Sequence, residues 1–314
     1  MPIRALKFSK GKVDIVEVDV PDVGDEEVLI QTKCCGICTG DLHVFNGLIT
    51  GSEGFSFLGH EPAGIVVEVG KSAETVKPGD KVTSIGGGRA FAEYYKTDQR
   101  RVKRIPDDVK EFELWISEPA TCVVNSIRNS GIQIGDNVCV IGCGYMGLLH
   151  IQAMPRNINN LTAVDIRDDV LDLAKKFGAD NTINPKEEDP AKEMNRIIGG
   201  EYDVVIEAAG VPNVMSLSTR LTRRGGILVS FGRHMTEEMV PINLWHKGMD
   251  VRNISPGYSK DFTEDFYDAV KLLKRGIFNQ KPLITHRASY QEAEKLFKVA
   301  AGKPKDYIKG VITF

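Results

Sequence analysis

The amino-acid sequence predicts an α/β protein in which a β-rich N-terminal region precedes a doubly wound parallel sheet. Three observations lead to this fold class. Short β patterns, separated by Gly, Pro and Asp turns, fill the first hundred residues. A glycine-rich motif at 142–147 joins an apolar strand to a helix, and strand and helix patterns alternate after it. The length of 314 residues suits about two domains.

The N-terminal strands are predicted from alternation of apolar and polar residues. They cover 13–20, 27–33 and 64–70, and turn residues end each one, which indicates a twisted, barrel-like lobe. A run of three glycines lies within 84–90. It is either a flexible connection or the floor of a pocket, and the first interpretation is favoured because Gly clusters mostly serve turns.

A candidate metal site begins with Cys38, His60 and Glu61. Thiolate, imidazole and carboxylate are ligand types that zinc prefers, and a catalytic zinc keeps one coordination position open. Buried cysteines are also common as small apolar residues, and a lone His is often structural, so both interpretations stay open at this point. Cys35 and Cys38 have the spacing of a redox pair, but no βαβ pattern surrounds them.

A helix is predicted to begin near Pro119, which suits a first helical turn. Glu118 and Cys122 are four residues apart and would share one face of this helix. Either could reach a metal held by Cys38 and His60. The alternative is a glutamate favoured by the helix dipole and an ordinary buried cysteine, and it remains open.

The second strong motif is Gly-x-Gly-x-x-Gly, formed by Gly142, Gly144, Tyr145, Met146 and Gly147 with Cys143 at the first variable position. It lies between a strand at 136–142 and a helix at 148–154. Glycines permit a tight turn and a close backbone approach, and the helix N-terminus faces a pyrophosphate. The motif therefore predicts a dinucleotide-binding site.

The next strand, 161–165, ends on Asp165, about 20 residues after the glycines. A carboxylate there accepts hydrogen bonds from the adenosine ribose and repels a 2′-phosphate, which favours NAD over NADP. Arg167 acts in the opposite direction, because a nearby arginine could accept that phosphate.

The remaining elements continue the alternation and then return to a mixed region. We expect the following strands and helices in chain order: a helix at 170–177, strands at 181–183, 202–208 and 226–231, helices at 261–275 and 290–299, and a strand at 308–314.

Composition excludes several classes of partner. The net charge is -3 and basic residues are scattered among acidic ones, which argues against nucleic acid and anionic membranes. Neither a signal-peptide pattern nor about 18 consecutive apolar residues is present. Six cysteines, three of them within 34–38, indicate thiols or ligands in a reducing compartment, so we expect a cytoplasmic protein.

Five motifs now stand in one order: Cys-Gly-Ile-Cys-x-x-Asp-x-His at 35–43, Gly-His-Glu at 59–61, Pro-Gly-Asp-x-Val at 78–82, the glycine motif, and Pro-Leu-Ile-Thr-His-Arg at 282–287. With them the chain resembles the zinc-dependent medium-chain dehydrogenase/reductase family, the group of alcohol, sorbitol and threonine dehydrogenases. The resemblance covers essentially the whole length.

The resemblance implies a GroES-like β-rich catalytic domain from residues 1–119 and 255–314, and a Rossmann NAD-binding domain from 120–254. It implies one catalytic zinc with Cys38, His60, Glu61 and Glu118 around it, Glu118 standing in a Glu-Pro motif typical of polyol dehydrogenases. Cys122 is an outside possibility as a ligand. In this resemblance His43 takes its family place near the nicotinamide ribose.

Three features depart from the family. No cysteine occurs between residues 82 and 91, so a second, structural zinc site is expected to be missing. Gly40 stands where relatives have a Ser or Thr of the proton relay, which leaves Thr39, a zinc-bound water or Glu61 to pass the proton on. Gly86 replaces a bulky pocket residue and implies room for a polyhydroxy substrate.

These implications predict a zinc-dependent enzyme that transfers a hydride between NAD and a secondary alcohol or ketone. By likeness to the Glu-Pro branch, the substrate is expected to be a polyol, cyclitol or sugar acid, and the assembly a homodimer or homotetramer. Two alternatives are a non-catalytic NAD(H)-binding protein and a zinc-free reductase of quinones or enones. Neither of these needs a metal shell.

Overall fold

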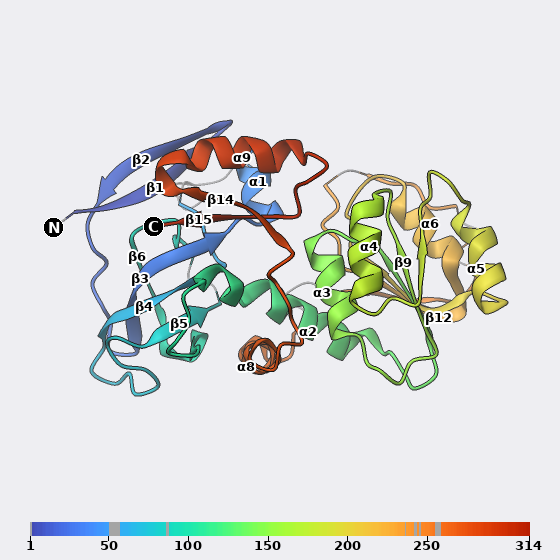
Figure 1. Cartoon of the computed structure of the whole chain (residues 1–314), viewed down its shortest axis with the longest axis horizontal. Coiled ribbons are helices and arrows are strands. Elements are labelled where there is room, and N and C mark those ends of the chain that lie inside the picture. The colour runs from blue at the N-terminus through green and yellow to red at the C-terminus, as the bar shows by residue number, and fades with distance from the viewer. Residues whose placement is uncertain are drawn as a thin grey trace. The chain divides into compact units, whose positions relative to one another are not determined.

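The computed structural model describes residues 2–49, 57–85, 88–235, 237–241, 244, 246–254 and 259–314. The chain divides into two compact units (Figure 1). The first contains Met1–Thr121 and Phe266–Phe314, and the second is Cys122–Asp265. Both ends of the chain thus belong to the first unit. Residue 255, where the expected second catalytic segment begins, lies outside the described residues.

The first unit is built on a seven-stranded sheet in the order β14-β15-β3-β4-β5-β7, with β6 paired to β3. A separate antiparallel hairpin joins β1 and β2. The strand bounds are β1 Ile3–Ser9, β2 Lys12–Val18, β3 Glu27–Gly36, β4 Pro62–Val69, β5 Lys81–Ser84, β6 Tyr94–Asp98, β7 Val102–Arg104, β14 Ile284–Ser289 and β15 Lys309–Thr313.

An aromatic cluster forms the core of this unit. Phe297, on α9 (Ala293–Gly302), packs against Phe8, Phe45 and Phe91 with ring centroids 4.9 to 5.6 Å apart. Figure 1 shows α9 running beside the strands β1 and β2. Full burial of each Phe side chain contributes roughly 1.5–3 kcal/mol relative to an exposed position. The C-terminal segment is therefore fastened onto the N-terminal lobe by its apolar face.

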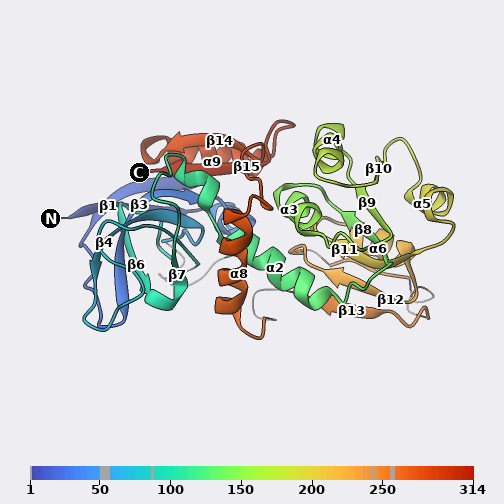
Figure 2. The ribbon, with the colours of Figure 1, turned by 60° about the horizontal axis from the view of Figure 1, so that its bottom comes forward.

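The second unit is a six-stranded, wholly parallel sheet in the order β10-β9-β8-β11-β12-β13. Its strands are β8 Asn137–Ile141, β9 Asn160–Val164, β10 Asn181–Ile183, β11 Tyr202–Glu207, β12 Thr222–Ser230 and β13 Asp250–Asn253. The central strands are continuous apolar runs, as expected where helices cover both faces. Figure 2 shows these strands side by side. The order is that of the dinucleotide-binding fold, and the predicted fold class is confirmed.

Helices connect the parallel strands by crossovers. They are α3 Tyr145–Ala153, α4 Asp168–Lys176, α5 Pro190–Ile198 and α6 Val214–Leu221. The first two pack against each other, and so do the last two. Because strand order reverses at β8, right-handed crossovers put these pairs on opposite faces of the sheet, as Figure 1 shows.

Three further helices complete the described elements: α1 Thr39–Phe45, α2 Glu118–Ser130 and α8 Phe262–Lys274, with 3₁₀ turns at Gln99–Arg101, Phe112–Trp115 and Tyr290–Glu292. The predicted strands and helices agree with the structure to within a few residues. No helix was predicted at α1, α5 or α6. At α1 the Cys38 side chain and Asp41 cap the helix at its N-terminus.

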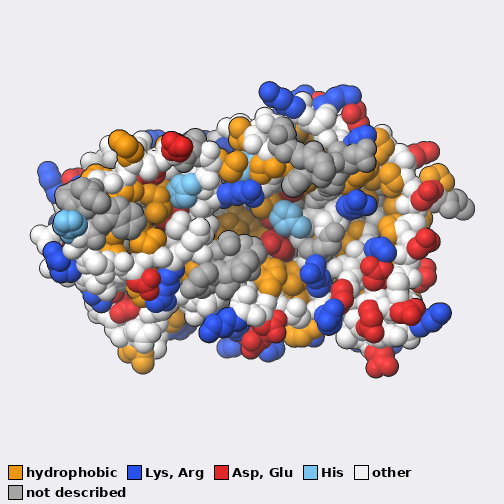
Figure 3. Space-filling view, turned by 180° about the vertical axis from the view of Figure 1, so that it is seen from behind, with side chains coloured by type: hydrophobic (Ala, Val, Ile, Leu, Met, Phe, Trp, Pro, Cys, Tyr) orange, Lys and Arg blue, Asp and Glu red, His pale blue; other side chains and the backbone are white. Residues whose placement is uncertain are grey.

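The surface carries charges of both signs. On the face in Figure 3, Lys and Arg side chains lie among Asp and Glu side chains without one large patch of either sign. Among the described residues, every helix is too short or too polar to cross a bilayer.

His150 is completely buried on α3, immediately behind the glycine motif. Its Nδ1 contacts the Met146 carbonyl at 2.8 Å, and its Nε2 contacts the Ser126 hydroxyl at 2.9 Å. The ring also packs edge-on against Phe231. Burial lowers the pKa of His150 to about 4. The imidazole is therefore neutral in the folded protein at neutral pH.

This burial predicts acid sensitivity. The pKa of this imidazole is about 6.5 in the unfolded chain and about 4 in the folded protein, so between these pH values the unfolded chain binds one proton more. The free energy of unfolding therefore decreases by about 3 kcal/mol as the pH is lowered from about 6.5 to about 4. His150→Gln, measured by urea unfolding from pH 7 to pH 4, should remove this part of the slope. The exposed His246→Gln is the control. If the pH dependence of the free energy of unfolding is the same in His150→Gln as in the wild type, a lowered pKa of His150 is contradicted.

Candidate active site

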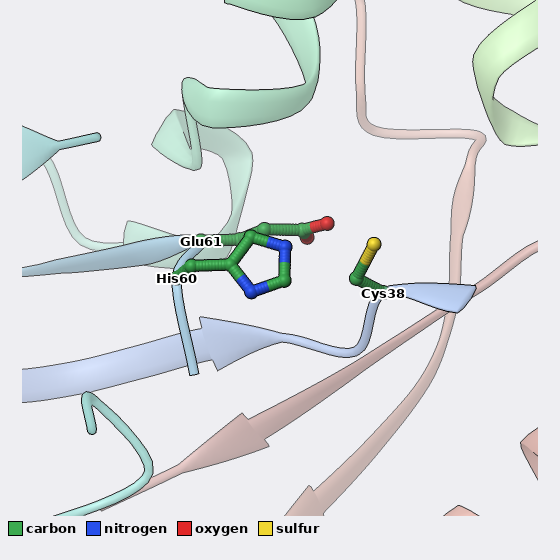
Figure 4. A group of neighbouring side chains, drawn as sticks. All are labelled: Cys38, His60 and Glu61. Carbon is green, nitrogen blue, oxygen red and sulfur yellow. The ribbon is translucent and has the colours of Figure 1, made fainter. Parts of the chain in front are cut away.

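The pairing of β3 with β4 brings the metal-ligand candidates together. Cys35 lies opposite Pro62 in this antiparallel pair, and the Gly36 N–H donates to the Glu61 carbonyl at 3.0 Å. Cys38 follows the end of β3 by two residues, while His60 and Glu61 immediately precede β4. The three side chains consequently converge from two neighbouring strand ends (Figure 4).

Their ligand atoms all lie within 4.8 Å of one another. Within the part of the chain that the structure describes, this is the only group of three or more His, Cys, Asp or Glu residues so arranged. Glu61 is buried, whereas Cys38 and His60 are partly exposed. The Cys38 Sγ also accepts a hydrogen bond from the Gly40 N–H at 3.4 Å, which stabilises negative charge on sulfur.

Asp41 contacts two members of this cluster, Cys38 and His60, although it was not selected from the sequence. Its carboxylate accepts the Cys38 N–H at 2.9 Å and lies 3.6 Å from the His60 Nδ1. Burial raises the pKa of Asp41, against the effect of His60. Burial alone would lower the pKa of His60, but Asp41, Cys38 and Glu118 hold it well above its ordinary value. A carboxylate behind one ring nitrogen leaves the other for a metal.

Lys309 is the second residue that the sequence analysis missed. It is buried at the start of β15, and its Nζ lies 2.5 Å from the Glu61 Oε2 and donates to the Ile37 carbonyl at 2.9 Å. A Cβ on Gly36 would lie 2.2 Å from the same carboxylate oxygen, so only glycine leaves room for it. The feature of the sequence that could have identified Lys309 is its position as the only charged residue in a largely apolar C-terminal strand.

The donor set fits zinc. One thiolate, one imidazole and one carboxylate can hold the ion and leave a position for substrate. Glu61 is already paired with Lys309, so Cys38 and His60 are the ligands with the clearest access. The redox alternative is disfavoured, because the Cys35 thiol is fully buried and burial raises its pKa well above the ordinary value.

The other predicted site residues are positioned as follows. Glu118 is the first residue of α2 and raises the pKa of His60 by its charge, and neither it nor Cys122 belongs to the 4.8 Å group. Thr39 is exposed at the first position of α1, and His43 lies in the last turn of that helix. Gly86 lies outside the described residues, so the pocket expected there is not described.

The glycine motif in the second unit is shaped for a dinucleotide. Gly142 has φ of +91°, and a Cβ there would lie 2.6 Å from the Ala209 N. A Cβ on Gly147 would lie 1.8 Å from the Gly142 carbonyl oxygen. Gly144 instead faces open space at the start of α3, with Tyr145 and Met146 as the first helical residues. The turn is thus closed on the protein side and open at the helix N-terminus.

Asp165 follows β9 and binds this turn directly. Its carboxylate accepts the Cys143 N–H at 2.7 Å and the Arg167 N–H at 3.0 Å, and burial raises its pKa. The Arg167 guanidinium is paired with Asp169 through two contacts, Nε to Oδ1 at 3.2 Å and Nη2 to Oδ2 at 2.6 Å. This bidentate pair directs the arginine toward Asp169, a partner that the sequence analysis did not consider.

Comparison with known proteins agrees with this geometry. Residues 24–107 match the family model of the alcohol dehydrogenase GroES-like domain, and residues 146–275 match that of the zinc-binding dehydrogenases. Sorbitol dehydrogenase 1 of Saccharomyces cerevisiae is 30% identical, over 96% of this chain and 95% of its own. L-threonine 3-dehydrogenase of Bacillus velezensis is 28% identical, over 90% of each chain.

A solved structure has the same fold. A protein from Sinorhizobium meliloti, titled a putative zinc-binding dehydrogenase and bound to NADP, superposes with a TM-score of 0.84 at 25% identity, over the whole of both chains. The fold and the site thus define a two-domain, zinc-type oxidoreductase. The chain belongs to the zinc-dependent medium-chain dehydrogenase/reductase family, and it is an enzyme of the alcohol and polyol dehydrogenase type.

The Glu61–Lys309 pair makes a testable prediction about stability. Lys309→Met leaves a buried carboxylate without its cation and should lower the free energy of unfolding of the metal-free protein by about 3–5 kcal/mol. Added zinc should restore part of that loss. The double variant Glu61→Gln with Lys309→Met removes both charges and serves as the control. If urea unfolding shows that Lys309→Met loses less than about 1 kcal/mol of the free energy of unfolding, the Glu61–Lys309 pair does not stabilise the fold as predicted.

The Arg167–Asp169 pair makes a prediction about cofactor choice. Asp169→Asn releases the guanidinium and should raise kcat/KM with NADP relative to NAD by about tenfold, that is about 1.4 kcal/mol. Asp168→Asn is the matched control, because it removes a carboxylate from the same helical turn, one that accepts a hydrogen bond from the Asn184 side chain. An equal change in both variants would show that net charge, and not release of Arg167, decides the ratio.

Proposed function

We propose that this enzyme oxidises a secondary alcohol of a polyol, cyclitol or sugar acid with NAD, or reduces the corresponding ketone, at a single catalytic zinc. The observation that carries this proposal is the cluster of Cys38, His60 and Glu61, whose sulfur, nitrogen and oxygen donors lie within 4.8 Å of one another. A metal held by such mixed ligands keeps a position for a substrate oxygen.

When bound, zinc supplies Lewis-acid polarisation of the substrate oxygen and the nicotinamide exchanges the hydride. Cys38 and His60 hold the metal from the ends of two paired strands. Glu61 is the third donor, kept close by Lys309. Glu118 acts from the start of α2, as a further ligand or as a nearby charge, and its effect on the pKa of His60 supports this role.

The proton leaves through the residues next to Cys38. Gly40 has no hydroxyl, so Thr39 and His43 on α1 are the side chains available for a relay. Thr39 is exposed and can exchange protons with solvent. His43 lies one turn further along the same helix, and Glu61 remains an alternative acceptor next to the metal.

The cofactor binds to the second unit. The backbone of Gly142, Gly144, Tyr145, Met146 and Gly147 would surround the pyrophosphate at the N-terminus of α3, where the helix dipole favours an anion. Asp165 accepts the ribose hydroxyls and makes NAD the cofactor, with Arg167 held by Asp169. In this proposal residues 120–254 form the NAD-binding domain, and 1–119 with 255–314 form the catalytic domain.

The substrate class rests on two relatives, whose names describe oxidation of a polyol and of the 3-position of threonine. Glu118-Pro119 at the start of α2 favours the polyol type. A zinc-free quinone or enone reductase would not need the Cys38 cluster, and a non-catalytic NAD(H)-binding protein would not need the charged residues around it. The cluster favours the zinc enzyme over both.

We further propose a cytoplasmic homodimer or homotetramer. All six cysteines are thiols outside any disulfide, and four of them are fully buried, as expected for a protein that keeps its thiols reduced. The net charge of -3 and the mixed surface suit a small polar substrate.

The test combines metal analysis with a substrate panel. The purified protein should contain about one zinc per chain and form NADH from sugar alcohols, cyclitols or sugar acids, at rates well above those with primary alcohols. Cys38→Ser should reduce kcat at least a hundredfold and zinc content by more than half, because serine is a poor zinc ligand.

Cys139→Ser is the control, since it removes a thiol on β8 of the second unit, outside the 4.8 Å group. NADH binding, followed by fluorescence, should persist in Cys38→Ser. Two zinc ions per chain would contradict the expected absence of a second zinc site. Full activity in Cys38→Ser would contradict the proposed catalytic site.

A further inference from the structure

A completely buried carboxylate, Glu207, ends strand β11 in the second unit. Its Oε1 accepts the backbone N–H groups of Ala209 and Gly210, both at 2.7 Å. Its Oε2 lies 2.8 Å from the Nε2 of His234, whose side chain is 22% exposed. The catalytic residues and the glycine motif do not include either of these side chains.

The same glutamate fixes the chain after β12. The N–H groups of Phe231 and Gly232 donate to the Glu207 backbone carbonyl at 2.9 and 2.8 Å. A Cβ on Gly232 would lie 2.5 Å from the Glu207 Oε2 and 2.5 Å from the Gly210 N, so these two turns are in contact around the carboxylate. His234 closes this arrangement from the solvent side.

The position of this pair in the sheet gives it a function. Strand order runs β10-β9-β8-β11-β12-β13, and a dinucleotide binds outside the carboxyl ends where that order reverses, between β8 and β11. Asp165, at the end of β9, marks the adenosine half. The nicotinamide half must therefore extend over the ends of β11 and β12, which are the turns that Glu207 and His234 hold.

A direct contact links these turns to the pyrophosphate site. The Gly142 backbone lies so close to Ala209 that a Cβ would be 2.6 to 2.7 Å from its atoms. The turn at Gly142 therefore borders residues 208–210 on one side, and Glu207 holds them from the other. Glu207 receives two N–H donors and an imidazole, and these offset the large cost of removing its charge from water.

We propose that Glu207 and His234 are positioning residues that fix the two turns beneath the nicotinamide half of bound NAD. The inference rests on the use of NAD proposed above and deepens it. The carboxylate determines the backbone path of residues 208–210, and His234 ties the segment after β12 to it. The reacting end of the cofactor is thereby held in one position, while the adenosine half depends on Asp165 and the glycine motif.

Two ligands separate this role from general stability. ADP-ribose contains the adenosine half and lacks the nicotinamide, whereas NADH contains both. Isothermal titration of the full-length, zinc-loaded protein measures the Kd of each. His234→Leu should weaken NADH about tenfold and ADP-ribose by less than about threefold, since it removes the hydrogen-bond partner of the Glu207 Oε2.

His234→Gln tests rescue, because its amide keeps an N–H donor, and it should bind NADH within about threefold of the wild type. Glu207→Gln should behave like His234→Leu. If that variant does not fold, the two variants of partly exposed His234 carry the test. His246→Gln, at an exposed site in the same unit, is the control and should bind both ligands normally.

Equal weakening of both ligands in His234→Leu, or a lower Tm with unchanged binding of both, would overturn the inference. A wild-type protein that binds NADH no more tightly than ADP-ribose would also overturn it, while leaving use of NAD intact. Failure of the wild type to bind either ligand would instead refute the proposed use of NAD, and the inference with it.

Discussion

The antiparallel pairing of β3 with β4 is the constraint on which the metal site depends. Register fixes Cys35 opposite Pro62, and from that pair the chain needs only a few residues to bring Cys38 beside His60 and Glu61. A slip of one residue would turn every side chain of β3 to the other face of the sheet. Burial of the β3 side chains, including Val28 and Ile30, makes such a slip costly, so the core of the lobe also preserves the ligand geometry.

Three side chains at the proposed sites are each restrained by a partner that was not selected from the sequence. Lys309 pairs with Glu61, Asp169 pairs with Arg167, and His234 contacts Glu207. In each case the partner decides what the restrained residue can still do: how freely a carboxylate approaches a metal, whether an arginine can accept a phosphate, and how firmly a turn is fixed. Two of the three carboxylates, Glu61 and Glu207, are fully buried, where an opposite charge or an N–H donor has its largest effect.

Much of this was predictable from sequence, for reasons that are local. The glycine motif could be recognised because the tight turn and the closely packed helix leave no room for a larger side chain. The alternation of strands such as β11 and β12 with helices predicts a parallel sheet. Cys38, His60 and Glu61 were selected as ligand types and are close in space. Helix α1 was missed because its signal is a capping interaction of a cysteine, which is not a usual N-cap residue. Lys309 and His234 were missed because their partners are 248 and 27 residues away in sequence, and only the fold joins them.

The central claim is that Cys38, His60 and a carboxylate hold one zinc ion in a mixed coordination shell. X-ray absorption spectroscopy at the zinc edge tests it most directly, because sulfur and nitrogen or oxygen ligands differ in bond length. The account predicts one sulfur at about 2.3 Å and two or three nitrogen or oxygen ligands at about 2.0–2.2 Å, with the sulfur signal lost in Cys38→Ser. A shell of four sulfurs, or a spectrum that Cys38→Ser leaves unchanged, would contradict it.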